Sequence, residues 1–175
     1  MSTSVEPVEV AQSGSDGKVS TAEIPSGEVS AVKTGYRKVA ILGSAESSIN
    51  EAPVSDDSWE RWGLAWSHGP EFRCTRYFDP HRLEWMKGRH ENYVAWLNGL
   101  LAPVYVIEWT PGEFQEVKTA VPIPLAEVLK VAQGYRNLPR GSHMSSIAYM
   151  VLMAIYEGVQ EIGLWGIDLL TEGEY

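Results

Sequence analysis

Short apolar runs alternate with helix-like stretches along the chain from Tyr36 onward. Residues 38–42 form a β-type apolar run that ends at Gly43, which predicts a buried first strand. The other predicted strands are residues 62–66, 74–78, 103–107 and 161–167. Because strands alternate with helices, the pattern predicts an α/β fold of the Rossmann-like type, with helices on both faces of a mainly parallel sheet in three layers.

The bounds of the predicted helices come from capping residues. Asp79 as N-cap and Pro80 at the first helical position predict a long helix that runs to about Leu100. The remaining helical segments are expected near residues 125–133 and from Ser145 or Ser146 to Gly158, with a brief helical turn at 56–58.

Residues 1–35 differ in composition from the rest of the chain. They contain no aromatic residue and are rich in Ser, Gly, Val and Glu, so they offer little apolar surface to bury. We expect a disordered, mildly acidic tail before one domain at 36–175. The alternative is an arm that docks on a protein partner by adding its Val-rich pieces to a sheet edge.

Composition narrows the class of protein. A net charge of −9 argues against a nucleic-acid binder that works through phosphate contacts. The single cysteine, Cys74, forbids an internal disulfide and makes a zinc site unexpected. With no signal pattern and no membrane-spanning apolar run, the sequence indicates a cytoplasmic protein. Residues 138–144 match the scar of a cleavable expression tag, so His143 carries no functional weight.

The loop after the first strand is the leading candidate for a ligand site. In an open parallel sheet, ligands bind at the carboxyl ends of the strands. Gly43 would let the backbone approach a phosphate, and the serines of residues 43–48 offer hydroxyl donors. The alternative is an ordinary strand-to-loop turn, because the loop has neither a Walker sequence nor GxGxxG spacing.

Two further features are expected at the same edge. Ser145 and Ser146 begin a helix, where they would favour an anion or serve only as an N-cap. Asp168 follows the last strand and would bind a ribose or sugar hydroxyl, or cap a loop. The residues predicted to bind a nucleotide are Gly43, Ser44, Ala45, Ser47, Ser48, Ser145, Ser146, Gly166 and Asp168.

The sequence shows no complete set of catalytic residues. His81, just after the third predicted strand, is the candidate for a catalytic side chain, whereas His90 is expected to be solvated. Trp59, Trp62 and Trp66 are expected in the core, or alternatively in the wall of a pocket. No metal or cofactor is predicted beyond a nucleotide or nucleotide-sugar ligand.

Three segments together, residues 39–48, 145–150 and 162–169, resemble a broad Rossmann-like group of proteins. The group includes bacterial sialyltransferases that use a CMP-sugar, and motility-accessory and MptE-like proteins of pyrophosphate transfer. Its members pair a Gly-x-Gly-Pro-Ser-like first loop with a later Ser-Ser/Gly-x-x-Ala helix and a strand that ends in Gly-x-Asp. The chain also resembles compact bacteriophage proteins of this type, at residues 78–81, 103–105 and 174–175.

The resemblance implies that the first loop and the Ser145–Ser146 pair hold the phosphates and the base or ribose, with Asp168 beside them. Ala45 and Glu46 stand where the transferases favour Gly-Pro, and an inward Glu46 would repel a phosphate. In the sialyltransferase-like enzymes, residues important for catalysis lie beyond the point where this chain ends. The resemblance therefore implies either a truncated enzyme or a binding module.

Three functions follow as hypotheses. The first is a glycosyltransferase-like enzyme that moves a sugar or related group from an activated nucleotide, in the host cytoplasm if a phage encodes it. The second is a non-catalytic module that sequesters or senses a nucleotide. The third is a phage structural or assembly protein that uses the fold as a scaffold. A bare sheet edge would also favour a homo-oligomer.

Overall fold

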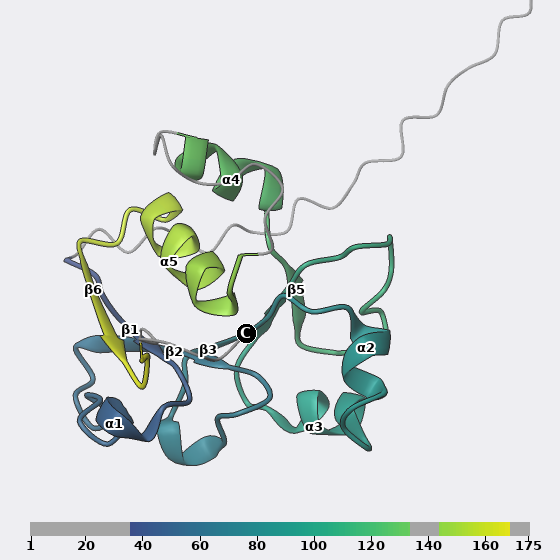
Figure 1. Ribbon diagram of the computed structural model, residues 1–175, viewed down its shortest axis with the longest axis horizontal. Coiled ribbons are helices and arrows are strands. Elements are labelled where there is room, and N and C mark those ends of the chain that lie inside the picture. Colours follow the sequence, from purple (N-terminus) through teal and green to yellow (C-terminus); the bar gives the residue numbers. More distant parts are fainter. Residues whose placement is uncertain (1–35, 134–143, 169–175) are drawn as a thin grey trace, which may run out of the picture. The chain divides into compact units, whose positions relative to one another are not determined.

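A computed structural model describes residues 36–133 and 144–168, which form an α/β fold around one sheet (Figure 1). The sheet has six strands in the order β5-β4-β3-β2-β1-β6, and every neighbouring pair is parallel. The strands are β1 (Lys38–Leu42), β2 (Trp59–Leu64), β3 (Arg76–Asp79), β4 (Val104–Val106), β5 (Ala120–Pro122) and β6 (Glu161–Trp165). The predicted α/β class with a parallel sheet is confirmed.

Helices cover both faces of the sheet (Figure 1). One face carries α1 (Glu46–Ile49), α2 (Leu83–Lys87) and α3 (Tyr93–Gly99), and the other carries α4 (Leu125–Gln133) and α5 (Ser146–Tyr156). A 3-10 turn, η1 (Pro70–Phe72), lies between β2 and β3 in the sequence. The described residues thus make three layers. The longest of their helices, α5, has only 11 residues, so none of them spans a bilayer.

The strand order explains how the helices divide between the faces. The chain adds β1 to β5 successively in one direction and then returns past β1 to form β6. Because crossovers between parallel strands are right-handed, this reversal moves the connecting helices to the opposite face. The reversal also creates a topological switch point between β1 and β6, and ligands of such sheets bind at the carboxyl ends of the strands there.

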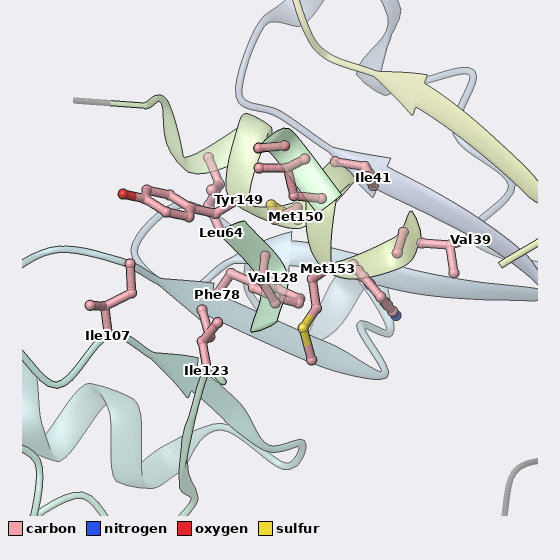
Figure 2. Packing of buried hydrophobic residues seen from close by; sticks show 14 residues of the cluster. Val39, Ile41, Leu64, Phe78, Ile107, Ile123, Val128, Tyr149, Met150 and Met153 are labelled. Carbon is pink, nitrogen blue, oxygen red and sulfur yellow. The ribbon is translucent and has the colours of Figure 1, made fainter. Parts of the chain in front are cut away.

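The core lies on both sides of β1. Val39 and Ile41 pack with residues of α4 and α5, whereas Ala40 and Leu42 pack on the opposite face, and all four are fully buried. A strand covered on both faces is therefore apolar throughout instead of alternating. Figure 2 shows the larger cluster, in which Met150 of α5 packs over the sheet.

The single helix predicted from Pro80 to Leu100 is wrong, because the structure has two short helices, α2 and α3, in that region. Asp79 does not cap a helix but ends β3, and its side chain is fully buried. The chain turns between the helices at Gly88, the C-cap of α2, and at Asn92, whose φ of 59° is left-handed. Asparagine enters this region more readily than most residues, but apolar periodicity does not show such a break.

The bounds of β3, β4 and β6 differ from the predicted ones by one or two residues, and β2 and β5 differ more. β2 begins at Trp59 and ends at Leu64, and residues 56–58 form a turn in which the Ser58 amide donates to Asp56 Oδ1 at 2.9 Å, not a helical turn. The sequence did not predict β5 because only three residues pair and the last is a proline. Proline is tolerated there because β5 is an edge strand.

Several sequence predictions lie outside the described residues. They are the disordered tail at residues 1–35 with its docking role, and residues 138–143 of the tag-like segment, including His143. The predicted α4 and α5 are confirmed, and Gly158 follows α5 with a left-handed φ of 69°.

Four charged residues tie the C-terminal end of α5 to the amino edge of the sheet. Arg37, just before β1, pairs with Glu60 of β2 at 2.9 Å and with Glu157 at the end of α5 at 3.0 Å. Arg76, which begins β3, pairs with Glu157 as well. Burial alone would raise the pKa of Glu60, but the hydrogen bonds and charge of Arg37 outweigh it and the pKa is lowered. Since α5 ends at the amino edge, its N-terminus lies toward the carboxyl edge.

Candidate functional site

The loops that follow β1 and β6 interlock at the carboxyl edge of the sheet. The Gly43 amide donates to the Trp165 carbonyl at 2.8 Å, and the Ala45 amide donates to the Gly166 carbonyl at 2.8 Å. A Cβ on Gly43 would overlap the Gly166 carbonyl, and a Cβ on Gly166 would lie 2.7 Å from the Gly43 carbonyl oxygen. Gly166 also has a left-handed φ of 66°. The contact between the two loops therefore requires glycine at both positions.

Serine side chains of the first loop strengthen this contact. Ser48 Oγ accepts a hydrogen bond from the Gly166 amide at 2.9 Å, and Ser47 Oγ donates to the carboxylate of Asp168. The structure thus brings the first loop, Gly166 and Asp168 together, but it uses Ser47 and Ser48 within the protein. Ser44 is exposed and forms no hydrogen bond with the described residues, which leaves its amide and hydroxyl free for a ligand.

Ser145 and Ser146 lie where the chain enters α5. Ser145 Oγ accepts a hydrogen bond from the Ala148 amide at 3.2 Å, so Ser145 is the N-cap. Ser146 is the first residue of the helix and is partly exposed. Within the described ranges, neither serine forms a hydrogen bond with the first loop or with Asp168. Capping needs only Ser145, and the hydroxyl of Ser146 has no hydrogen-bond partner among the residues that the structure describes.

A buried histidine, which the sequence analysis did not single out, supports the first loop from the side of β2. His68 is 1% exposed; its Nδ1 accepts from the Leu64 amide at 3.1 Å, and its Nε2 donates to the Gly43 carbonyl at 3.0 Å. Burial lowers the pKa of His68, against the opposing effect of these hydrogen bonds. The neutral ring with its proton on Nε2 satisfies both contacts.

A fully buried carboxylate at the end of β3 holds two other side chains. Asp79 Oδ2 accepts from the Tyr93 hydroxyl at 2.7 Å, and Asp79 Oδ1 accepts from His81 Nδ1 at 2.9 Å and from the His81 amide at 3.1 Å. Burial, and then the negative charge of Asp79, raises the pKa of Tyr93, so the phenol keeps its proton. With Nδ1 as donor to the carboxylate, Nε2 of the partly exposed His81 is the nitrogen free to act as a base.

Two arginines add positive charge near His81, and the sequence analysis did not identify them. The guanidinium of Arg82 lies over the ring of Trp109 at 5.6 Å. That of Arg89 lies 4.0 Å over Trp85, and His81 stacks on the same Trp85 ring at 5.1 Å between centroids. Both arginines are exposed and form no ion pair with the described residues. They are therefore available to an anionic ligand at the end of β3.

A cavity of about 230 Å³ opens beside the Asp79–Tyr93 pair. Its lining consists of aromatic rings and one carboxylate, contributed by the segment after β2, the α2–α3 turn and α3. The lining residues are Trp66, His90, Glu91, Tyr93 and Trp96.

The three tryptophans predicted either for the core or for a pocket wall divide between these roles. Trp62 is fully buried in the core, Trp59 packs edge-to-face on Trp165, and Trp66 lines the cavity. His90, predicted to be solvated, is exposed but also lines the cavity.

No protein-family model, curated protein or solved structure matches this chain. The structure therefore shows an α/β fold with a six-stranded parallel sheet. Membership of the sialyltransferase-like group stays a prediction. In residues 36–133 and 144–168, no three His, Cys, Asp or Glu side chains gather as a set of metal ligands.

Proposed function

We propose that the protein binds a nucleotide or nucleotide-sugar along the carboxyl edge of its sheet and transfers the activated group to an acceptor, in a glycosyltransferase-like reaction. The switch point between β1 and β6 supports a ligand at this edge. The fold alone does not choose the reaction. The observation that carries the transfer step is the buried carboxylate of Asp79, which orients His81.

His81 would act as the general base. In transfer from a nucleotide-sugar, the acceptor hydroxyl loses its proton as its oxygen bonds to the transferred carbon and the bond from that carbon to the phosphate oxygen breaks. Nε2 of His81 takes the proton, and Asp79 stabilises the imidazolium and fixes the orientation of the ring. Tyr93 is a positioning residue, because it holds Asp79 and not the substrate.

Groups on three loops and on the first residue of α5 would hold the donor molecule. Ser44 and Ser146 offer neutral hydrogen-bond donors to its phosphates, Arg82 adds a positive charge, and Asp168 would accept from a ribose or sugar hydroxyl. β1 and β3 lie two strands apart, which separates their carboxyl ends by about 10 Å. An extended nucleotide-sugar covers such a span, so one ligand can reach both Ser44 and His81.

Thermal shift of the full chain with CMP, UMP and their sugar conjugates tests binding. A ligand that binds the folded state raises the melting temperature by mass action. We expect this rise to shrink in Arg82→Gln and Ser146→Ala but not in Arg73→Gln, a control in which the exposed arginine pairs with Asp57. No rise with any of these compounds at millimolar concentration overturns the proposal. Gly43 is unsuited to this test because its substitution would disturb the loop contact itself.

Turnover separates an enzyme from a non-catalytic binding module. We expect His81→Gln to keep the thermal shift and to lose transfer or hydrolysis by about a hundredfold or more. Asp79→Asn should lower turnover too, because the amide no longer favours the imidazolium. A wild-type protein that binds the nucleotide-sugar and leaves it intact with every acceptor would be the binding module instead.

A further inference from the structure

We propose that the cavity beside the α2–α3 turn is a second binding site, and that it takes a small organic cation of the alkylammonium class. This site is separate from the nucleotide contacts proposed above. Its walls, its charge and its size each support the assignment.

The walls are aromatic rings from three segments of the chain. Trp66 and Trp96 are 39% and 43% exposed, and they line the same cavity together with Tyr93. Two partly exposed indoles in one hollow leave apolar surface in water that folding alone would tend to bury. The faces of aromatic rings, tryptophan above all, attract cations, and sets of such rings recognise alkylated ammonium groups.

Among the described residues, the lining contains one carboxylate, that of Glu91, beside the imidazole of His90, and no lysine or arginine. Glu91 is exposed and lines the cavity, and its carboxylate forms no ion pair or hydrogen bond with any described residue. A carboxylate beside aromatic faces attracts an ammonium group and repels an anion such as a phosphate. The chain's net charge of −9 adds to this preference.

Two of the three rings, those of Trp96 and Tyr93, are held in place before any ligand arrives. Trp96 Nε1 donates to the Ala65 carbonyl at 2.6 Å, and the hydroxyl of Tyr93 donates to Asp79. Asn92, with its left-handed φ of 59°, sets the turn between Glu91 and Tyr93. Side chains that are already fixed lose less conformational entropy on binding, which favours a specific site over an adaptable surface.

The size of the cavity argues for a small group. Its volume of about 230 Å³ lies below the ~300–1,000 Å³ of pockets that enclose drug-sized ligands. A trimethylammonium headgroup fits such a space, whereas a complete nucleotide-sugar does not.

The test is titration of the full chain with choline, followed by tryptophan fluorescence and calorimetry. The control ligand is the uncharged isostere of choline, in which a tert-butyl group replaces the trimethylammonium group. We expect choline to bind about tenfold or more tightly than the isostere, because only choline gains the cation–π and carboxylate interactions. Equal binding of the two compounds, or no binding of choline at millimolar concentration, would overturn the proposal.

Matched variants locate the site. Trp66→Ala and Glu91→Gln should each weaken choline binding by about fivefold to tenfold. Trp85→Ala and Glu51→Gln, which change an exposed tryptophan and an exposed glutamate outside the cavity, should leave it unchanged. The assignment is wrong if the two control variants weaken choline binding and the two cavity variants do not. It is also wrong if cytidine or uridine displaces choline. Nucleotide-sugar binding has no part in this test, so either proposal can fail without the other.

Discussion

Gly43 and Gly166 meet backbone to backbone at the switch point of the sheet, and neither position has room for a Cβ. The two loops that surround this contact come from adjacent strands, β1 and β6, which lie far apart in the sequence. From the sequence alone, Gly43 is expected to let the backbone approach a phosphate. The structure supplies a reason within the protein itself, and that reason is testable without any ligand.

Gly43→Ala should lower the free energy of unfolding by about 1–3 kcal/mol, because the new methyl group forces the β6 loop away from its packed position. Urea denaturation of the variant and the wild type measures this. Gly99→Ala is the matched control: Gly99 ends α3 with no atom near its Cβ position, and alanine there should be neutral or stabilise by a few tenths of a kcal/mol. Equal stability of Gly43→Ala and Gly99→Ala would contradict the contact.

Ser48→Ala should destabilise the fold more than Ser47→Ala does. Ser48 Oγ accepts from the partly buried amide of Gly166, and its loss leaves that amide unpaired at a cost of about 1 kcal/mol. Ser47 bonds to Asp168 at an exposed position, where water replaces the lost partner. Chemical denaturation of the two variants compares their free energies of unfolding directly. A larger loss of stability in Ser47→Ala would contradict the prediction, because it would show that the contact between the β1 and β6 loops depends more on Ser47 than on Ser48.

His68 should make the protein less stable as the pH falls below its ordinary pKa of 6.5. Burial lowers the pKa of the folded His68, so the unfolded chain binds a proton more readily. This contribution to stability is present above pH 6.5 and is lost as the pH falls toward the lower folded pKa. Urea midpoints across this range should drop in the wild type, and the drop should be smaller in His68→Phe, whatever the overall stability of that variant. His90→Phe, which removes an exposed histidine in the same way, is the matched control.

The parts of this fold that the sequence predicted are those with a strong local signal. The apolar run of β1 is buried on both faces, and the capped, apolar α5 has its serine and glycine at the expected ends. By contrast, β5 pairs over only three residues, and its place in the sheet comes from β4 beside it. No local pattern in the chain shows such a pairing.

The candidate site was predicted only in part, for a similar reason. The sequence placed the first loop and Asp168 at one edge, and they meet there. It interpreted Asp79 as a helix cap because Asp-Pro is typical of a helix start, whereas the carboxylate is buried under Tyr93, 14 residues away in the chain. The link between His68 and Gly43, across 25 residues, is equally invisible before folding.

Glu60, in the network of four charged residues at the amino edge, should make the protein less stable at acid pH. The pKa of Glu60 is lowered in the folded state, so its contribution to stability is fully present above its ordinary pKa of 4.5 and is lost as the pH falls from there through the lower folded pKa. Glu60→Gln should therefore destabilise the protein by about 1 kcal/mol near neutral pH, a modest value because the side chain is partly exposed to screening water.

As the pH falls below 4.5 and then through the lower folded pKa of Glu60, the difference in stability between wild type and Glu60→Gln should disappear, because both then carry a neutral side chain opposite Arg37. The matched control is Glu127→Gln, which removes an exposed pair with Lys130 on α4 and should cost only about 0.3 kcal/mol near neutral pH. Urea denaturation at neutral and acid pH gives both comparisons. If the difference in stability between wild type and Glu60→Gln stayed constant with pH, Glu60 would act through packing. Its charge would then not hold α5 to the sheet.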